Sequence, residues 1–167
     1  MPAARAWATF QPVTDIVSDS ITLVAFQIRD GRPWFLLLRR DTAGAPPEEW
    51  EVVSGRRRAD ESPPRAAIRR LLEWTALDPN ALWALDHLSG GYDVERDVIA
   101  VTPCFAAQVS GSVELSDRHD ASRWLSVREA ANTCSSHAAR AVIELANAQC
   151  ALPLAAGAGP SPRTRIV

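Results

Sequence analysis

Residues 55–77 of this chain read GRRRADESPPRAAIRRLLEWTAL, and this stretch decides the fold. Ser62 is followed by two prolines, a sequence typical of a helix N-cap with proline in the first turn. Apolar side chains then recur at helical spacing, at Ala66, Ala67, Leu71 and Trp74. The stretch therefore predicts a loop followed by a helix over about residues 62–76.

The spacing of this stretch resembles the Nudix box, G-x5-E-x7-R-E-U-x-E-E-x-G-U with U apolar, in which glutamates hold Mg²⁺ against a diphosphate. The matching positions are Gly55, Glu61, Arg69, Leu71, Glu73 and Leu77. Flanking segments extend the resemblance over roughly residues 18–147, and WEVVSG at 50–55 and LSDRHDASRWLSV at 115–127 are similar to the branch that hydrolyses dihydroneopterin triphosphate. The resemblance implies an α+β fold, a Nudix-type α/β/α sandwich around a mixed β-sheet.

Several acidic positions of the family's metal site hold other residues here. Arg70 and Trp74 stand where the helix carries glutamates, and Arg58 and Arg118 stand at carboxylate positions of the loop and of a late segment. An arginine about 5 Å from a divalent ion repels it by about 6 kcal/mol at an effective dielectric of about 20. The resemblance therefore implies that the usual Mg²⁺ cluster does not form and that the general base is lost, because arginine stays protonated.

The retained residues of the box have an expected structural role. Glu61 and Arg69 match the family pair that ties the loop to the helix, and Gly55 is expected to satisfy a backbone or packing requirement. If the chain is active, Glu61 and Glu73 are the catalytic candidates, Glu73 is the candidate metal ligand, and Mg²⁺ is the cofactor. Ala76 replaces the family's glycine, which predicts an altered or strained helix end.

Arginines at several of these positions suggest an anion site in place of the metal site. The candidate ligand-binding residues are Arg39, Arg40, Arg58, Arg70 and Arg118, since the planar guanidinium group suits bidentate contacts with phosphate. We therefore predict a Nudix-fold protein that has lost Mg-dependent diphosphate hydrolysis and binds a nucleotide or another small phosphorylated ligand, with no cofactor. Loss of function without any ligand stays open, because all 18 basic residues are arginine and any single one is weak evidence.

Two alternatives remain at this point. The first is an active Nudix hydrolase of a nucleoside or pterin polyphosphate whose metal ligands have moved, for example to Glu48, Glu49, Glu51, Asp93, Glu95 or Asp97. The second is a protein-interaction module that uses an exposed sheet edge or the C-terminal tail. The substrate and the oligomeric state cannot be read from the sequence.

The length of 167 residues, 47% of them hydrophobic, fits one domain with a sizeable core. We expect an N-terminal extension (1–17), a Nudix-like domain (18–150) and a flexible tail (151–167). Apolar runs predict a hairpin from 21–28 and 34–40. They also predict strands at 83–88 and 98–109 around a loop at 89–97, and helices at 126–131 and 135–148.

Charge and composition exclude several classes of protein. The net charge of −2 and the pI of about 5.9 argue against general nucleic-acid binding. The sequence has no apolar run of membrane-spanning length and no signal-peptide pattern. Three cysteines without C-x-x-C spacing indicate neither a disulfide framework nor a zinc site. A cytoplasmic location is the default expectation.

Overall fold

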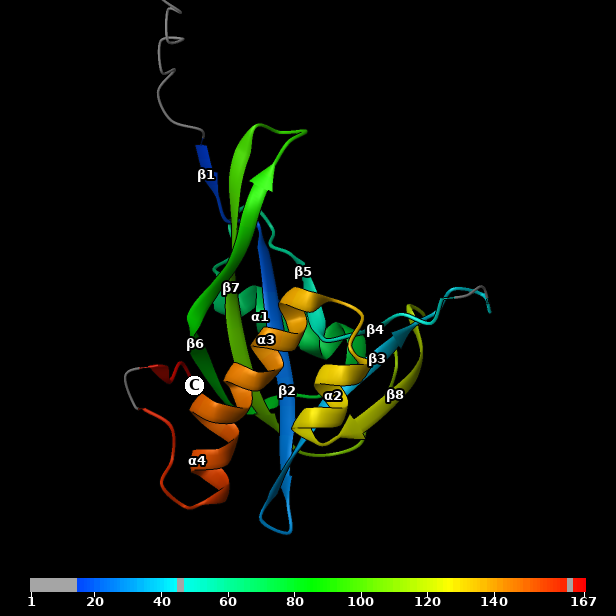
Figure 1. The fold of residues 1–167 in the computed structure, drawn as a ribbon, viewed down its shortest axis with the longest axis vertical. Coiled ribbons are helices and arrows are strands. Elements are labelled where there is room, and N and C mark those ends of the chain that lie inside the picture. Colours follow the sequence, from blue (N-terminus) through cyan, green and yellow to red (C-terminus); the bar gives the residue numbers. More distant parts are fainter. Residues whose placement is uncertain (1–14, 45–46, 162–163) are drawn as a thin grey trace, which may run out of the picture.

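The computed structural model describes residues 15–44, 47–161 and 164–167; most of the expected N-terminal extension, residues 1–14, lies outside the described residues (Figure 1). Within the described part of the chain, one mixed sheet has eight strands in the central order β1-β7-β2-β3-β4. Strand β5 pairs with β2, β6 with β7 and β8 with β3. The strands are β1 (Asp15–Val17), β2 (Ser20–Arg29), β3 (Arg32–Arg40), β4 (Trp50–Glu51), β5 (Val53–Arg56), β6 (Pro79–Asp93), β7 (Val98–Val109) and β8 (His119–Leu125).

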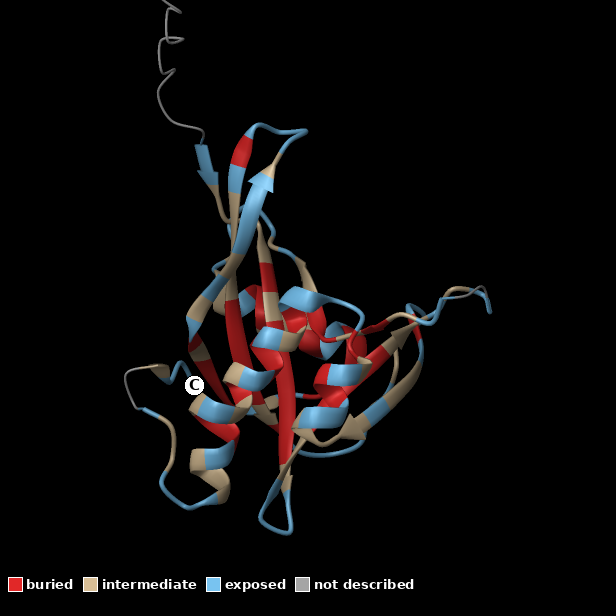
Figure 2. Cartoon of the chain, in the orientation of Figure 1, coloured by how far each residue is buried: buried red, intermediate tan, exposed pale blue. Residues whose placement is uncertain are grey.

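Helices cover both faces of this sheet, which confirms the predicted α/β/α sandwich (Figure 1). Helix α1 (Pro63–Thr75) packs on one face, and α2 (Val127–Thr133) and α3 (His137–Ala146) pack on the other. Successive strand residues point to opposite faces, so β2 supplies Leu23 to the α1 side and Val24 to the α2/α3 side. Figure 2 shows the buried residues concentrated between these layers.

The predicted helix over 62–76 is confirmed as α1. Ser62 at its N-cap is extended, with φ −69° and ψ 152°, and Pro63 and Pro64 follow in the first turn. At the other end Ala76 keeps the left-handed conformation, with φ 54°, and its N–H donates to the carbonyl of Leu72 at 2.9 Å. A residue with a Cβ in this conformation costs about 1–2 kcal/mol, so the helix end is strained as the missing glycine predicts.

The predicted loop at 89–97 is wrong for residues 89–93, and only residues 94–97 form a turn. Strand β6 continues through Ser89, Gly90 and Gly91 to Asp93, because these residues pair with Thr102, Val101 and Ala100 of β7. Serine and glycine have low strand propensity, and long-range pairing overrides it here. The resulting β6–β7 hairpin forms an arm that projects beyond the helices, with β1 parallel to β7 at its side (Figure 1).

The segment expected as a flexible tail contains defined structure. A π-helical turn (Asn147–Ala151) extends α3, and helix α4 (Leu152–Ala155) follows. Further on, the N–H of Ile166 donates to the carbonyl of Leu82 at 2.7 Å, and the carbonyl of Val167 accepts from Leu82 at 3.1 Å. Flexibility of the tail stays a prediction. None of the helices in the described residues is long and apolar enough to cross a membrane.

Candidate functional site

The loop between β5 and α1 places Gly55 directly against Arg70. A Cβ built on Gly55 would lie 2.5 Å from Nε of Arg70, and Gly55 has a φ of +153°, which side chains rarely adopt. Glycine is therefore required here by close packing as well as by backbone conformation. The Nε atom of Arg70 is itself buried and lacks a hydrogen-bond partner among the described residues.

Glu61 and Arg69 form a bidentate pair that fastens the loop to α1. Nε and Nη2 of Arg69 donate to the two carboxylate oxygens of Glu61, each at 2.7 Å, and Nη2 also donates to the carbonyl of Arg56 at 3.2 Å. The backbone N–H of Arg58 donates to Glu61 at 3.0 Å. These contacts, the Arg69 hydrogen bond foremost, lower the pKa of Glu61 from 4.5 to about 2. This geometry indicates that Glu61 and Arg69 hold the loop in place against α1.

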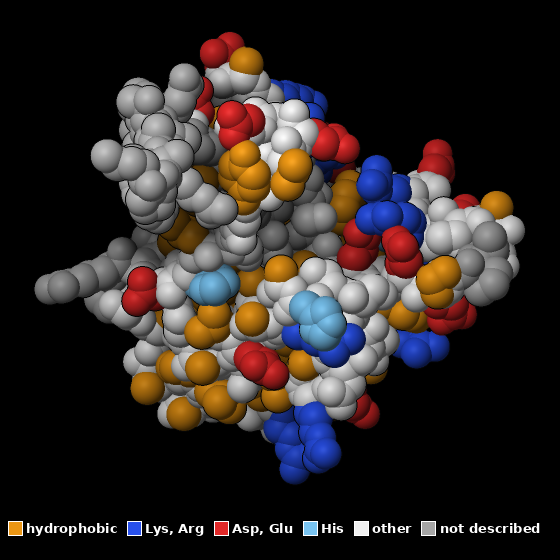
Figure 3. All heavy atoms as spheres, turned by 45° about the horizontal axis from the view of Figure 1, so that its top comes forward, with side chains coloured by type: hydrophobic (Ala, Val, Ile, Leu, Met, Phe, Trp, Pro, Cys, Tyr) orange, Lys and Arg blue, Asp and Glu red, His pale blue; other side chains and the backbone are white. Residues whose placement is uncertain are grey.

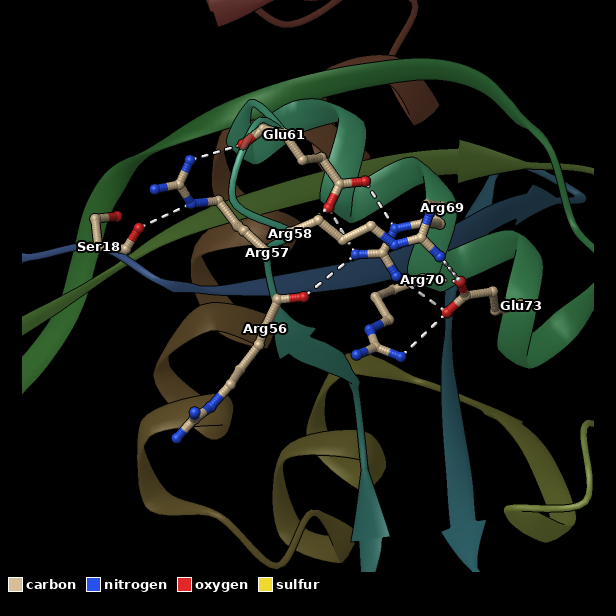
Figure 4. Close-up of polar contacts among 8 residues, drawn as sticks. All are labelled: Ser18, Arg56, Arg57, Arg58, Glu61, Arg69, Arg70 and Glu73. Atoms are coloured by element: carbon tan, nitrogen blue, oxygen red, sulfur yellow. Dashed lines mark hydrogen bonds and ion pairs between the residues drawn. The ribbon is translucent and has the colours of Figure 1, made fainter.

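The arginine run in the loop is partly structural. Nε of Arg57 donates to the carbonyl of Ser18 at 2.8 Å, and its Nη1 donates to the carbonyl of Glu61 at 2.7 Å (Figure 4). Arg57 thus joins the start of the sheet to the loop. Arg56 instead points away from this cluster (Figure 4) and forms no salt bridge within the described part of the chain.

Glu73, the retained glutamate of the helix face, is held by arginines. Nη1 of Arg69 and Nη1 of Arg70 each donate to it at 3.1 Å, and Nη2 of Arg58 lies 3.6 Å from it (Figure 4). Three guanidinium groups therefore face the two carboxylates of Glu61 and Glu73, and one positive charge remains in excess. The structure brings Arg58 and Arg70 together, as the sequence suggested.

Trp74 is a core residue and not an open stacking surface. It is 5% exposed and packs with Leu71 and the apolar residues of the sheet. The guanidinium carbon of Arg118 lies 5.3 Å from the centre of the indole ring, and the His119 ring lies 4.7 Å from it. Arg118 thus stacks on Trp74, which is one helical turn from Arg70.

Arg39 and Arg40 on β3 each meet two carboxylates. Arg39 pairs with Asp120 at 2.7 Å and Glu48 at 2.9 Å. Arg40 pairs with Glu49 at 2.9 Å and with Glu51 at 2.6 Å. Arg39, Arg40 and their carboxylate partners form a second cluster, which shares no residue with the cluster around Glu73.

Sequence reasoning missed the pair formed by Glu51 and the buried His119, whose Nε2 lies 3.1 Å from the Glu51 carboxylate. Burial alone would raise the pKa of Glu51, but hydrogen bonds from His119 and Arg40 and their charges outweigh burial and lower it. Nδ1 of His119 has no partner within the described residues. Glu51 also faces a pocket on the α3 side of the sheet.

This pocket has a volume of about 240 Å³, and five of its nine lining residues carry hydroxyl groups, so we call it the hydroxyl-lined pocket. Thr22 pairs with Ser54 across β2 and β5, and Ser89 pairs with Thr102 across β6 and β7, so the pairs share one face. The full lining is Thr22, Glu51, Val52, Ser54, Ser89, Thr102, Ser136, Ala138 and Ala139. In the sequence, the signal that could have predicted this pocket is the presence of polar residues at inward-facing positions of mostly apolar strands.

A family model for the NUDIX domain matches residues 20–146. The chain belongs to the Nudix family. A Listeria monocytogenes protein described as a NUDIX hydrolase shares 19% identity and a TM-score of 0.70, with 87% of this chain and 99% of that chain covered. The NUDIX domain of Shewanella oneidensis NrtR, solved with ADP ribose, shares 20% identity and a TM-score of 0.61, covering 87% and 94%. The E. coli dihydroneopterin triphosphate pyrophosphohydrolase shares 22% identity and a TM-score of 0.57, covering 77% and 95%. Such identities show a shared fold. A comparison with curated proteins found no significant match.

The Nudix fold implies Mg²⁺ in an active enzyme, and the residues of this chain do not fit that ion. Mg²⁺ requires hard oxygen ligands in octahedral geometry. In the part of the chain that the structure describes, no three His, Cys, Asp or Glu side chains are grouped closely enough to hold a metal. The carboxylates considered as relocated ligands occupy two separate places. Glu48, Glu49 and Glu51 pair with Arg39 and Arg40, whereas Asp93, Glu95 and Asp97 lie at the end of the arm.

Proposed function

We propose that this chain is a Nudix-family protein that binds a small phosphorylated ligand, such as a nucleoside diphosphate, without metal and without hydrolysing it. The observation that supports this is the Glu73 carboxylate held by Arg58, Arg69 and Arg70 (Figure 4). Three guanidinium groups converge on one carboxylate, and such groups bind phosphate in the same geometry. Glu73 therefore acts as an internal anion. A ligand phosphate would bind beside Glu73 on the same arginines or would replace Glu73 as their partner.

Loss of hydrolysis follows from the two retained glutamates. A general base needs a pKa near the working pH, and the Glu61 pKa of about 2 makes it a poor proton acceptor from water. Glu73 is surrounded by arginines, which repel a divalent ion and compete for its oxygens. Neither residue is then placed to activate a metal-bound water.

The hydroxyl-lined pocket is the proposed place for the remainder of the ligand. Ser54 lines it, and Arg56 follows two residues later on the same face of β5. Gly55 between them packs against Arg70, so the guanidinium cluster lies on the α1 side of β5 and the pocket on the α3 side. A ligand that fills both would pass over the edge of β5 that faces away from its partner strand β2. Hydroxyl groups suit the sugar or base of a nucleotide, and the NrtR domain was solved with ADP ribose, which contains both.

We include Arg118 in the proposed anion site and leave out Arg39 and Arg40. Arg118 lies over Trp74, one helical turn from Arg70, so both arginines serve the same side of α1. Each of the other two already contacts two carboxylates. Binding an anion there would first break these ion pairs.

Thermal shift without metal tests the proposal. Pyrophosphate or a nucleoside diphosphate should raise the melting temperature more than sulfate does at matched ionic strength, because binding to the folded state stabilises it. Arg58→Ala, Arg70→Ala and Arg118→Ala should each reduce that shift. Arg32→Ala, at the exposed first residue of β3, is the control and should not reduce it. Equal shifts in all four variants would mean charge screening and would overturn the proposal.

A further inference from the structure

The arm formed by β6 and β7 carries an apolar face that no described part of the chain covers. Directly paired residues of antiparallel strands point to the same side. Leu88 faces the same side as Pro103, and Tyr92 the same side as Ile99. Ile16 of β1 pairs with Ile99 and joins them. We define the apolar arm face as Ile16, Leu88, Tyr92, Ile99, Val101 and Pro103.

The opposite side of the arm has a different composition. It carries Ser89 opposite Thr102 and Asp93 opposite Val98, and its lower part lines the hydroxyl-lined pocket. The exposed large apolar residues of the paired strands, Leu88, Tyr92 and Ile99, thus lie on one side, and the polar residues lie on the other together with Val98. A strand pair that projects into solvent has no core to explain this alternation.

The exposure of the apolar arm face is large. Ile16 is 67% exposed, Leu88 62%, Tyr92 56% and Ile99 40%. Most of the arm is exposed in Figure 2, outside the buried centre of the sheet. The four residues expose on the order of 450 Å² together, which is within the range of about 300–600 Å² of the largest apolar patch on a typical monomer, and such patches are often functional. Gly90, in the middle of this face, leaves it flat and cannot gain a side chain, because a Cβ would lie 2.4 Å from the carbonyl of Ala100.

We propose that the apolar arm face pairs with the same face of a second copy of this chain. Two copies would bury roughly 900–1,200 Å², the lower end of specific interfaces, which favours a reversible dimer. In such a dimer a twofold axis passes through the arm, so the tip of each copy, DVERD at 93–97, points toward the base of the partner's arm. The RRR segment at 56–58 lies beside that base. The tip has three carboxylates and one arginine, Arg96, which pairs with Asp19 of the same chain at 3.0 Å, so the remaining negative charge of the tip complements that segment. Figure 3, turned to bring the arm end forward, shows acidic side chains beside hydrophobic ones at this end.

Sedimentation velocity of the full chain over a micromolar concentration series tests the proposed dimer. The wild type should shift from monomer to dimer as its concentration rises. Leu88→Glu with Tyr92→Glu should stay monomeric at every concentration, with an unchanged far-ultraviolet circular dichroism spectrum. The matched control is Leu152→Glu on α4, which alters a residue that is 50% exposed and lies outside the arm. It should dimerise like the wild type.

A charge reversal at the tip gives a second readout that does not touch the apolar residues. Glu95→Arg should weaken the dimer about twofold to fivefold, as expected for an exposed rim charge. A wild-type chain that stays monomeric throughout would overturn the proposal. So would a dimer that survives Leu88→Glu with Tyr92→Glu or is lost in Leu152→Glu. These outcomes do not depend on ligand binding, so they leave the proposed function untouched.

Discussion

Neutralising Glu73 should strengthen anion binding, which is the reverse of its effect in a metal-dependent hydrolase. Glu73 contacts Arg69 and Arg70 at 3.1 Å and Arg58 at 3.6 Å, so it shields the arginines that we assign to the ligand. The Glu73 carboxylate repels one phosphate charge at about 5 Å by about 0.8 kcal/mol in water and by about 3 kcal/mol at a dielectric of about 20. The Glu73 side chain is 37% exposed, so a value near the lower end applies. We take the repulsion between Glu73 and the bound phosphate as about 1.4 kcal/mol, which corresponds to a tenfold change in affinity.

Isothermal titration calorimetry with pyrophosphate in the absence of divalent metal measures this effect. Glu73→Gln should bind about tenfold more tightly than the wild type. Glu144→Gln, a change of the same charge at an exposed position of α3, should bind like the wild type. An unchanged or weaker affinity in Glu73→Gln would refute the assignment of Arg58 and Arg70 to the anion site.

Three further predictions concern the scaffold. Trp74→Ala should lower the free energy of unfolding in a urea titration by about 3–5 kcal/mol, because Trp74 is 5% exposed; a loss below about 1 kcal/mol would contradict its role as a core residue. The folded-state pKa of Glu61 is below its ordinary value of 4.5, so its stabilisation is present above pH 4.5 and is lost as the pH falls toward 2; Glu61→Gln should flatten this acid dependence in thermal melts, and an unaltered profile would exclude the pair with Arg69 as its cause. Gly55→Ala should destabilise the wild type more than an Arg70→Ala background, because the added Cβ would lie 2.5 Å from Arg70; equal losses would show that backbone strain alone matters.

The fold could be predicted because its decisive signals are local. Helix α1 is predicted by the prolines after Ser62 and by the helical spacing of the apolar residues that follow. The loop before α1 and the helix itself then set the positions of Gly55, Glu61 and Arg69. The arm could not be predicted in the same way. Its glycines are poor strand formers, and only pairing with β7 makes them a strand.

The candidate site was predicted only in part, because the partner of a long charged side chain is set by the folded chain. Arg39 meets Asp120, 81 positions away, and Arg118 stacks on Trp74. Neither contact has a local signature. The same holds for the hydroxyl-lined pocket, since Thr22 and Ser54 become neighbours only through the pairing of β2 and β5.

We propose that the box of this Nudix protein no longer supports metal-dependent hydrolysis. The most direct measurement is release of phosphate or pyrophosphate from nucleoside triphosphates, dihydroneopterin triphosphate and ADP-ribose with millimolar Mg²⁺ or Mn²⁺. With Glu73 held by arginines, the wild type and Glu73→Ala should both release no more than the background without protein. Robust turnover by the wild type that is lost in Glu73→Ala would contradict this proposal and would assign the metal to Glu73.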